Sequence, residues 1–151
     1  MEKTKMKIAI GSDHGGWNAK KEIIKRLKAE GHEVLDCGTN GPEMVDYPVY
    51  AKKTVECMFN NKADFSILIC GTGIGMSIAA NKIDGVRAAH CTDCFSSEMA
   101  KAHNNANVIC LGERITGIEL MWKILTSYMS AKYLEGIHAP RVEMLNDMKK
   151  A

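Results

Sequence analysis

The sequence Ser66-Ile-Leu-Ile-Cys70 runs directly into Gly71-Thr-Gly-Ile-Gly75 and then into an apolar segment that ends near Asn81. A short aliphatic run followed by a glycine-rich turn and a helical segment is typical of a buried parallel strand and its following helix. Glycines at alternate positions let the backbone turn sharply and aim several N–H groups at one point, beside the positive end of a helix dipole. The stretch therefore predicts an anion-binding loop for a phosphate or for the oxyanion of an enediolate, and a tight turn without a ligand is the alternative.

On both sides of this stretch, short β-rich runs alternate with longer segments of helical period. The expected strands are residues 7–11, 32–36, 65–70, 86–89 and 106–111, and the expected helices are residues 17–30, 47–60, 74–81, 95–103, 117–131 and 139–149. Right-handed crossovers place helices on both faces of a parallel sheet. The pattern predicts an α/β fold, a three-layer α/β/α sandwich around a five-stranded parallel sheet (Rossmann-like), with a C-terminal helix. The length favours a single domain over residues 1–151.

In such a sheet, ligands bind beyond the carboxyl ends of the strands. The loops 12–16, 37–46, 71–75, 91–94 and 112–116 each follow a predicted strand. We therefore expect these loops to share one rim of the sheet and to carry the site.

Composition limits the possible partners. Lys and Arg number 20 against 18 acidic residues, with no long run of one charge, which argues against nucleic acid or a membrane surface and favours a small molecule. The opening MEKTKMKIAI lacks the apolar core of a secretory signal, and glycines interrupt the most apolar segment, so we expect a cytoplasmic protein. Its six cysteines are then expected to be reduced thiols.

Three side chains near the predicted rim are suited to proton transfer. Cys70 directly precedes the glycine loop, where a helix dipole favours a thiolate, although a buried cysteine acting as a small hydrophobe is the commoner case. Asp13 and His14, in Gly11-Ser-Asp-His-Gly-Gly16, could exchange protons with sugar hydroxyls. Asp13 could equally cap a helix, and His14 could be a solvated loop residue.

Four further residues are candidates for acid–base or phosphate-binding roles. His103 and Asn104 lie where a helix gives way to a strand, and His103 could be a general acid or base or simply complement the helix dipole. Arg114 and Arg141 are candidate phosphate ligands because a guanidinium fork matches phosphate geometry, although most exposed arginines bind no phosphate.

Two other patterns carry less weight. Cys91-Thr-Asp-Cys94 has the spacing of a redox pair or half a zinc site, but no second pair follows. Asp36 stands where a ribose-binding acid would follow a dinucleotide fingerprint, yet the first loop lacks G-x-G-x-x-G, and Asp13 would repel a pyrophosphate.

Taken together, the motifs resemble the type B ribose-5-phosphate isomerase family, which also includes galactose-6-phosphate and allose-6-phosphate isomerases. The motifs are Gly11-Ser-Asp-His-Gly15, Asp46-Tyr-Pro48, Ile69-Cys-Gly-Thr-Gly-Ile-Gly75, Ala79-Ala-Asn-Lys82, His103-Asn104, Asn107-Val108 and Arg141-Val142. The resemblance covers nearly the whole chain. It implies an isomerase without metal or cofactor, active in carbohydrate metabolism as a homodimer or a dimer of dimers, with each active site built from two subunits.

The resemblance also implies catalytic roles. Asp13 and His103 would assist opening of the sugar ring, and Cys70 would move the proton between C1 and C2. The enediolate would be held by the Thr72 side chain and by the backbone amides of Gly71, Gly73 and Gly75. Some members use a glutamate in the glycine loop as the base, but this chain has Met76 near that position, which favours Cys70.

By the same resemblance, Tyr47 and Asn104 would bind sugar hydroxyls, while His14, Arg114 and Arg141 would bind the phosphate. Many members carry an arginine four residues before the one that matches Arg141, where this chain has Ile137. The predicted reaction is the interconversion of ribose 5-phosphate and ribulose 5-phosphate. A six-carbon aldose 6-phosphate such as allose or galactose 6-phosphate, or a free sugar, is the alternative substrate, and a nucleotide-binding regulatory module or a thiol-redox protein is the alternative class.

Overall fold

The computed structural model describes residues 4–148 and contains one five-stranded sheet whose strands are all parallel. The strands are β1 (Lys7–Ser12), β2 (Glu33–Asp36), β3 (Phe65–Cys70), β4 (Ala88–His90) and β5 (Val108–Gly112). The helices are α1 (Trp17–Ala29), α2 (Tyr47–Asn60), α3 (Ile74–Asn81), α4 (Cys94–Ala102), α5 (Ile118–Ser130) and α6 (Ala139–Asp147), with a short 3-10 turn, Gly136–His138, before α6. The predicted fold class is confirmed.

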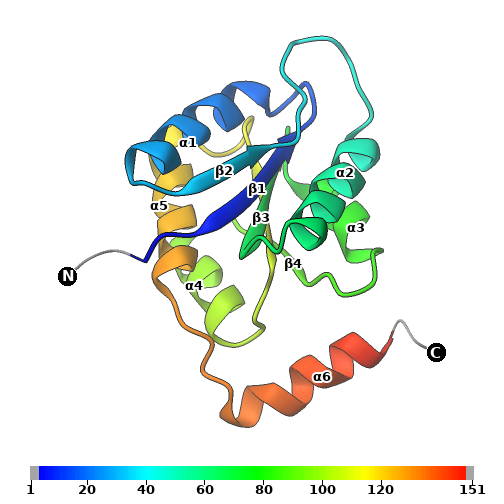
Figure 1. Cartoon of the computed structure of the whole chain (residues 1–151), viewed down its shortest axis with the longest axis vertical. Helices are drawn as coiled ribbons and strands as arrows, with labels where there is room; N and C mark the ends of the chain where they lie inside the picture. Colours follow the sequence, from blue (N-terminus) through cyan, green and yellow to red (C-terminus); the bar gives the residue numbers. More distant parts are fainter. Residues whose placement is uncertain (1–3, 149–151) are drawn as a thin grey trace.

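The strand order β2-β1-β3-β5-β4 puts the aliphatic run of β3 at the centre of the sheet, where all six residues are buried. Helices α1, α4 and α5 cover one face and α2 and α3 the other, giving the three layers seen in Figure 1. Side chains alternate between the two faces along each strand. Ile8 and Ile10 therefore pack in the core beneath α1, α4 and α5, whereas Ala9 packs in the core beneath α2 and α3. A strand buried on both faces explains why the sequence of β3 is almost continuously apolar.

β3, α2 and α3 have the expected bounds, and the described ends of the other elements differ from the expected ones by at most two residues. β4 begins at Ala88 rather than at residue 86, because the backbone N–H of Arg87 donates to the side chain of Asn107 instead of to a neighbouring strand. β5 correspondingly runs from Val108 to Gly112. Residue 149, the expected end of the last helix, lies outside the described residues.

The strand order creates a switch point at the carboxyl edge of the sheet, between β1 and β3. After β1 the chain winds outward to β2, and it then returns past β1 to β3, so the loops after β1 and β3 diverge at neighbouring strands. Such a switch point is where parallel α/β sheets bind ligands. The five predicted loops do share this rim.

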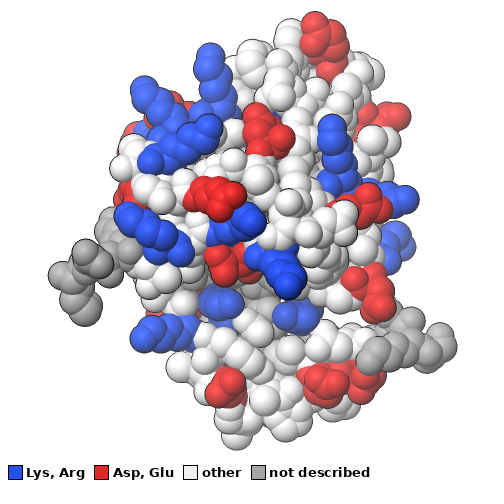
Figure 2. All heavy atoms as spheres, viewed as in Figure 1, with Lys and Arg blue, Asp and Glu red and all other residues white. Residues whose placement is uncertain are grey.

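Helix α6 lies at the other end of the molecule. In Figure 1 it runs beneath the sheet, beyond the amino ends of the strands. A hydrogen bond of 2.9 Å from Arg87 Nη1 to Asn146 Oδ1 and another of 2.9 Å from the Leu134 N–H to the Ala102 carbonyl attach this C-terminal part. Positive and negative side chains are interspersed on the face shown in Figure 2. Among residues 4–148, no helix is both long and apolar enough to span a bilayer.

Candidate active site

The loops after β1 and β3 contact each other at the switch point. Asp13 is 7% exposed, its N–H donates to the Ile69 carbonyl at 3.3 Å, and its Oδ1 accepts from the Gly15 N–H at 2.8 Å. Asp13 therefore closes its own turn and does not cap α1, whose N-cap is Gly16. The turn lies directly against the glycine loop, since a Cβ added to Gly15 would come within 3.1 Å of the Gly71 nitrogen.

Cys70 ends β3 with its thiol at the base of the glycine loop. Cys70 is 5% exposed, and the Gly73 N–H donates to its Sγ at 3.1 Å. Gly73 has φ of +85° and is the N-cap of α3, a conformation that requires glycine. The Gly73 amide, which was expected to hold an enediolate, is thus engaged by Cys70.

The rest of the glycine loop presents a hydroxyl and a covering ring. Thr72 is exposed, and its Oγ1 accepts from the Ile74 N–H at 3.2 Å. A Cβ on Gly75 would lie 2.9 Å from ring carbons of Tyr47, so the absence of a side chain lets the Tyr47 ring rest on the loop. Tyr47 is 40% exposed at the start of α2. Its hydroxyl end therefore lies at the rim, beside the loop.

Arg114 is brought to the glycine loop by the pairing of β5 with β3. The Arg114 N–H donates to the Gly71 carbonyl at 2.9 Å, and a Cβ on Gly71 would lie 3.3 Å from Arg114 Nη1. The neighbouring Glu113 accepts from the Ala19 N–H through Oε1 at 2.5 Å. Because this amide belongs to the first turn of α1, Glu113 supplies the cap that the chain around Gly16 lacks and fixes the loop that carries Arg114.

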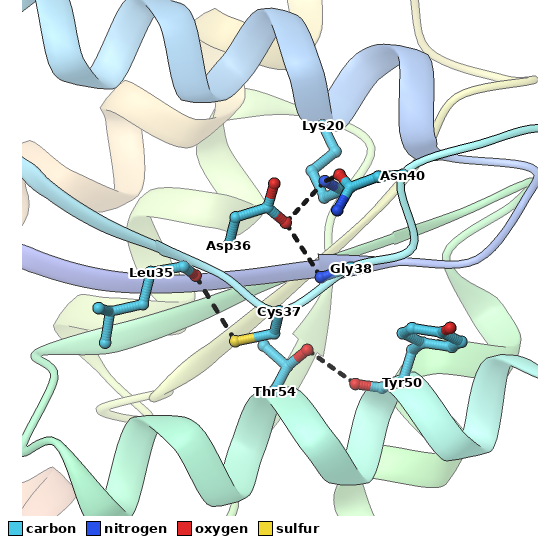
Figure 3. A network of polar contacts seen from close by, with 8 residues as sticks. All are labelled: Lys20, Leu35, Asp36, Cys37, Gly38, Asn40, Tyr50 and Thr54. Carbon is cyan, nitrogen blue, oxygen red and sulfur yellow. Dashed lines mark hydrogen bonds and ion pairs between the residues drawn. The ribbon is translucent and has the colours of Figure 1, made fainter.

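The 37–46 loop brings His14 and Tyr47 into the group. The Val45 N–H donates to His14 Nδ1 at 3.2 Å, so in the neutral ring the proton lies on Nε2. The loop is anchored at its start by Lys20, which is 1% exposed. Lys20 Nζ lies 2.7 Å from Asp36 Oδ1 and 2.7 Å from Asn40 Oδ1 (Figure 3).

Three of the predicted site residues lie elsewhere. His103 is the C-cap of α4, Asn104 follows it, and Arg141 is on α6. Val108 begins β5 and pairs with Ser66, whereas Gly112 ends it beside Cys70, so about 13 Å of strand separates the two ends. Within one chain, His103, Asn104 and Arg141 are therefore at the opposite edge from Cys70.

His103, His138 and Arg141 form a second cluster, made of basic side chains. The His103 ring stacks on that of His138 with centroids 4.1 Å apart and planes 14° from parallel. The pKa of His138 is lowered by desolvation and then by the positive charges of His103 and Arg141. Because the lowered pKa favours the neutral His138 ring, the permanent charge of this cluster is that of Arg141, whose guanidinium is suited to a phosphate.

Comparisons with known proteins show the family of this chain. The model of the family described as Ribose/Galactose Isomerase matches residues 8–145. The chain belongs to this family. It is 42% identical over 144 residues to ribose-5-phosphate isomerase B of Escherichia coli K12, covering 95% of this chain and 97% of that protein.

Other members of the ribose/galactose isomerase family differ in their named substrates. The galactose-6-phosphate isomerase subunit LacB of Clostridium acetobutylicum is 42% identical over 128 residues, which is 85% of this chain and 74% of that one. The structure of Clostridium thermocellum ribose-5-phosphate isomerase B superposes with a TM-score of 0.94 at 48% identity, covering 96% and 98% of the two chains.

The Cys91-x-x-Cys94 pair has separate surroundings in this family member. Cys91 is 1% exposed, and burial raises the pKa of its thiol to about 11. Asp93 between them caps α4 by accepting from the Ser96 N–H at 2.7 Å, which lowers the pKa of its carboxyl. All six cysteines are free thiols. Within residues 4–148, no three His, Cys, Asp or Glu side chains are grouped to hold a metal ion.

Three polar residues around the site were missed by the sequence reasoning. Glu113 and Lys20 act through partners that lie far away in the chain, and no local pattern indicates them. His90 follows from a signal that was available: it ends a strand, and its Nε2 lies 2.7 Å from the Thr72 carbonyl oxygen. A search of every residue at a strand's carboxyl end would have included it.

Proposed function

We propose that this chain is an aldose–ketose isomerase that interconverts ribose 5-phosphate and ribulose 5-phosphate through an enediolate, with Cys70 as the base. The observation that carries the proposal is the Cys70 thiol, buried at the switch point and hydrogen-bonded by the N–H that begins α3. A redox protein built on Cys91 and Cys94, or a nucleotide-binding module, has no need for a thiol at this position. The named activities of the relatives support the same reaction class.

The proposed reaction needs no external oxidant. With the ring opened by Asp13 and His103, the Cys70 thiolate removes the proton on C2, and the electron pair of that C–H bond forms a double bond between C1 and C2. Negative charge develops on the O1 oxygen, where the Thr72 hydroxyl and the loop amides of Gly71 and Gly75 would stabilise it. The proton of the C2 hydroxyl passes to O1, and as the negative charge on O2 collapses to a carbonyl, the thiol returns its proton to C1, which leaves a ketone at C2.

Two subunits would build each active site. The residues proposed for ring opening and phosphate binding fall into two groups at opposite edges of one chain, with Cys70 in the first and His103 and Arg141 in the second. A homodimer in which the second cluster of one copy meets the rim of the other brings the groups together. Tyr47 and Asn104 would then bind sugar hydroxyls from opposite subunits, and a dimer of dimers would keep this pairing.

The identity of the sugar phosphate depends on the residues proposed to bind its phosphate group. His14 and Arg114 would bind phosphate from the rim and Arg141 from the second cluster. Ile137, where many relatives have arginine, is 72% exposed beside His138 and adds no charge there. This substitution and the LacB relative favour allose or galactose 6-phosphate, or a free sugar, as the alternative substrate. One domain over residues 1–151, location in the cytoplasm and independence of metals and cofactors remain predictions.

The first experiment measures ketose formation from ribose 5-phosphate, allose 6-phosphate and galactose 6-phosphate, together with solvent-deuterium uptake at C2 of the aldose that remains. Cys70→Ala should abolish turnover, while the control Cys94→Ala should retain it. Turnover by Cys70→Ala would refute the proposed base. A reversible disulfide with loss of function in Cys94→Ala would favour the redox alternative, and ligand binding without turnover of any sugar would favour the nucleotide-binding module.

A second experiment tests the shared site by complementation. Cys70→Ala and His103→Ala are each expected to be inactive as homodimers. When the two chains are refolded together, mixed dimers have one site with both residues intact, so about a quarter of parental activity should return. No recovery, with mixed dimers verified by mass spectrometry, would place both residues in a site within one chain.

A further inference from the structure

His90 contacts the glycine loop from an adjoining part of the sheet. It ends β4, which pairs with β5 so that His90 lies beside Cys110, and β5 in turn pairs with β3. His90 Nε2 lies 2.7 Å from the carbonyl oxygen of Thr72. A carbonyl oxygen only accepts hydrogen bonds, so Nε2 carries a proton and donates it.

The imidazole also packs directly on Gly73. A Cβ added to Gly73 would come 2.7 Å from His90 Cδ2 and 3.0 Å from His90 Nε2. The backbone φ angle of Gly73 is +85°, which also favours glycine at this position. The ring therefore rests against the Cα of the residue whose N–H reaches Cys70. Its contact with the loop is a packed one, not a chance approach of a surface side chain.

The Thr72 carbonyl and the Gly73 N–H belong to one peptide group. His90 donates to the oxygen of this peptide at 2.7 Å, and the nitrogen of the same peptide donates to Cys70 Sγ at 3.1 Å. Withdrawing electron density at the carbonyl oxygen makes the N–H a stronger donor, because hydrogen bonds in a chain polarise one another. A stronger donor favours a thiolate over a thiol.

We propose that His90 is a positioning residue for Cys70, acting through the Thr72–Gly73 peptide. It orients this peptide so that the Gly73 N–H points at sulfur, and it polarises the peptide so that the thiolate is better stabilised. The catalytic consequence rests on the proposed function, in which Cys70 is the base. The chemical consequence, a more nucleophilic Cys70, does not depend on any turnover.

The test compares His90→Leu with His90→Gln. Leu fills much of the space of the ring but donates no hydrogen bond, whereas the Gln side-chain amide can place a donor near the position of Nε2. Carbamidomethylation of Cys70 by iodoacetamide at pH 7.5 is followed by peptide mass spectrometry, which separates Cys70 from the other five thiols. Urea unfolding verifies that each variant is folded.

Removing the donor should slow alkylation of Cys70 about three- to tenfold in His90→Leu, the range expected from losing one modest net hydrogen bond. His90→Gln should stay within about twofold of the parent. Turnover number should fall with alkylation rate while KM is unchanged, because His90 is proposed to act on the thiol and not on the substrate.

Parental alkylation in His90→Leu would overturn the proposal. So would equal slowing in His90→Gln, which would mean that the ring only fills space, or a raised KM with parental turnover number, which would mean that His90 acts on binding. These results are separable from the proposed function: if Cys70→Ala kept full turnover, that function would fail whatever the alkylation rates.

Discussion

Replacing Lys20 by Met removes the buried charge that anchors the 37–46 loop. Lys20 is 1% exposed, with Nζ 2.7 Å from both Asp36 Oδ1 and Asn40 Oδ1. Met keeps most of the apolar stem and leaves both acceptors without this donor. In Figure 3 the bonds of Lys20 link α1 to Asp36, the last residue of β2, and to Asn40 in the loop that follows. We expect the variant to fold, but with a loosened loop.

The size of the effect follows from the exposure of the partners. A hydrogen bond to a charged group contributes about 1.5 to 3 kcal/mol net. The Asp36 side chain is 38% exposed and also accepts from the Gly38 N–H. Water and this backbone N–H therefore offset part of the free energy lost with the Lys20 hydrogen bond. We expect the free energy of unfolding to fall by about 2 to 3 kcal/mol in total. With a urea m-value near 2 kcal/mol/M, the midpoint should fall by about 1 to 1.5 M.

Urea unfolding at one fixed protein concentration, followed by tryptophan fluorescence and circular dichroism, measures this shift. The control is Lys21→Met, which removes an exposed lysine from the same helix and should change stability by no more than about 0.5 kcal/mol. Equal midpoints for the two variants would refute the anchoring role. KM for the sugar phosphate should rise only in Lys20→Met, because the loop positions His14 through Val45.

Three other predictions use the same assays. Gly75→Ala should raise KM several-fold without loss of stability, because the new Cβ would displace the Tyr47 ring 2.9 Å away while alanine favours the helix by about 1 kcal/mol; an unchanged KM would contradict it. Burial raises the thiol pKa of Cys37 to about 12 and of Cys91 to about 11, so the unfolded chain releases these protons first and stability should fall as pH rises from about 9 to 11; a urea midpoint that is level between pH 8 and 10.5 would argue against this. Asp93→Ala should lower stability at neutral pH and speed hydrogen exchange at the start of α4. Because the folded pKa of Asp93 is lowered, the difference from the parent should vanish as pH falls below that pKa, and a gap that persists in acid would exclude the cap as its cause.

Much of the fold was predictable because the buried positions of helices and strands are apolar and recur in the sequence in recognisable patterns. The β3 run is apolar throughout since helices cover both of its faces, and the glycines after Cys70 mark the turn into α3. Placing the loops on one rim then required only that the strands be parallel. Asp13, Thr72 and Tyr47 were proposed in this way or by resemblance, and the structure places all of them at or beside the glycine loop.

What the sequence alone determined is therefore the class of fold, the rim and the nature of its glycine loop, since these depend on local pattern. The tertiary structure decided which strands are neighbours. Because β5 lies between β3 and β4, Arg114 reaches Gly71 and His90 reaches Thr72, although 43 and 18 positions of sequence separate these pairs. It also put His103 at the opposite edge from Cys70. Such contacts depend on chain segments far apart in sequence, and their geometry leaves no periodic signal that a single sequence can record.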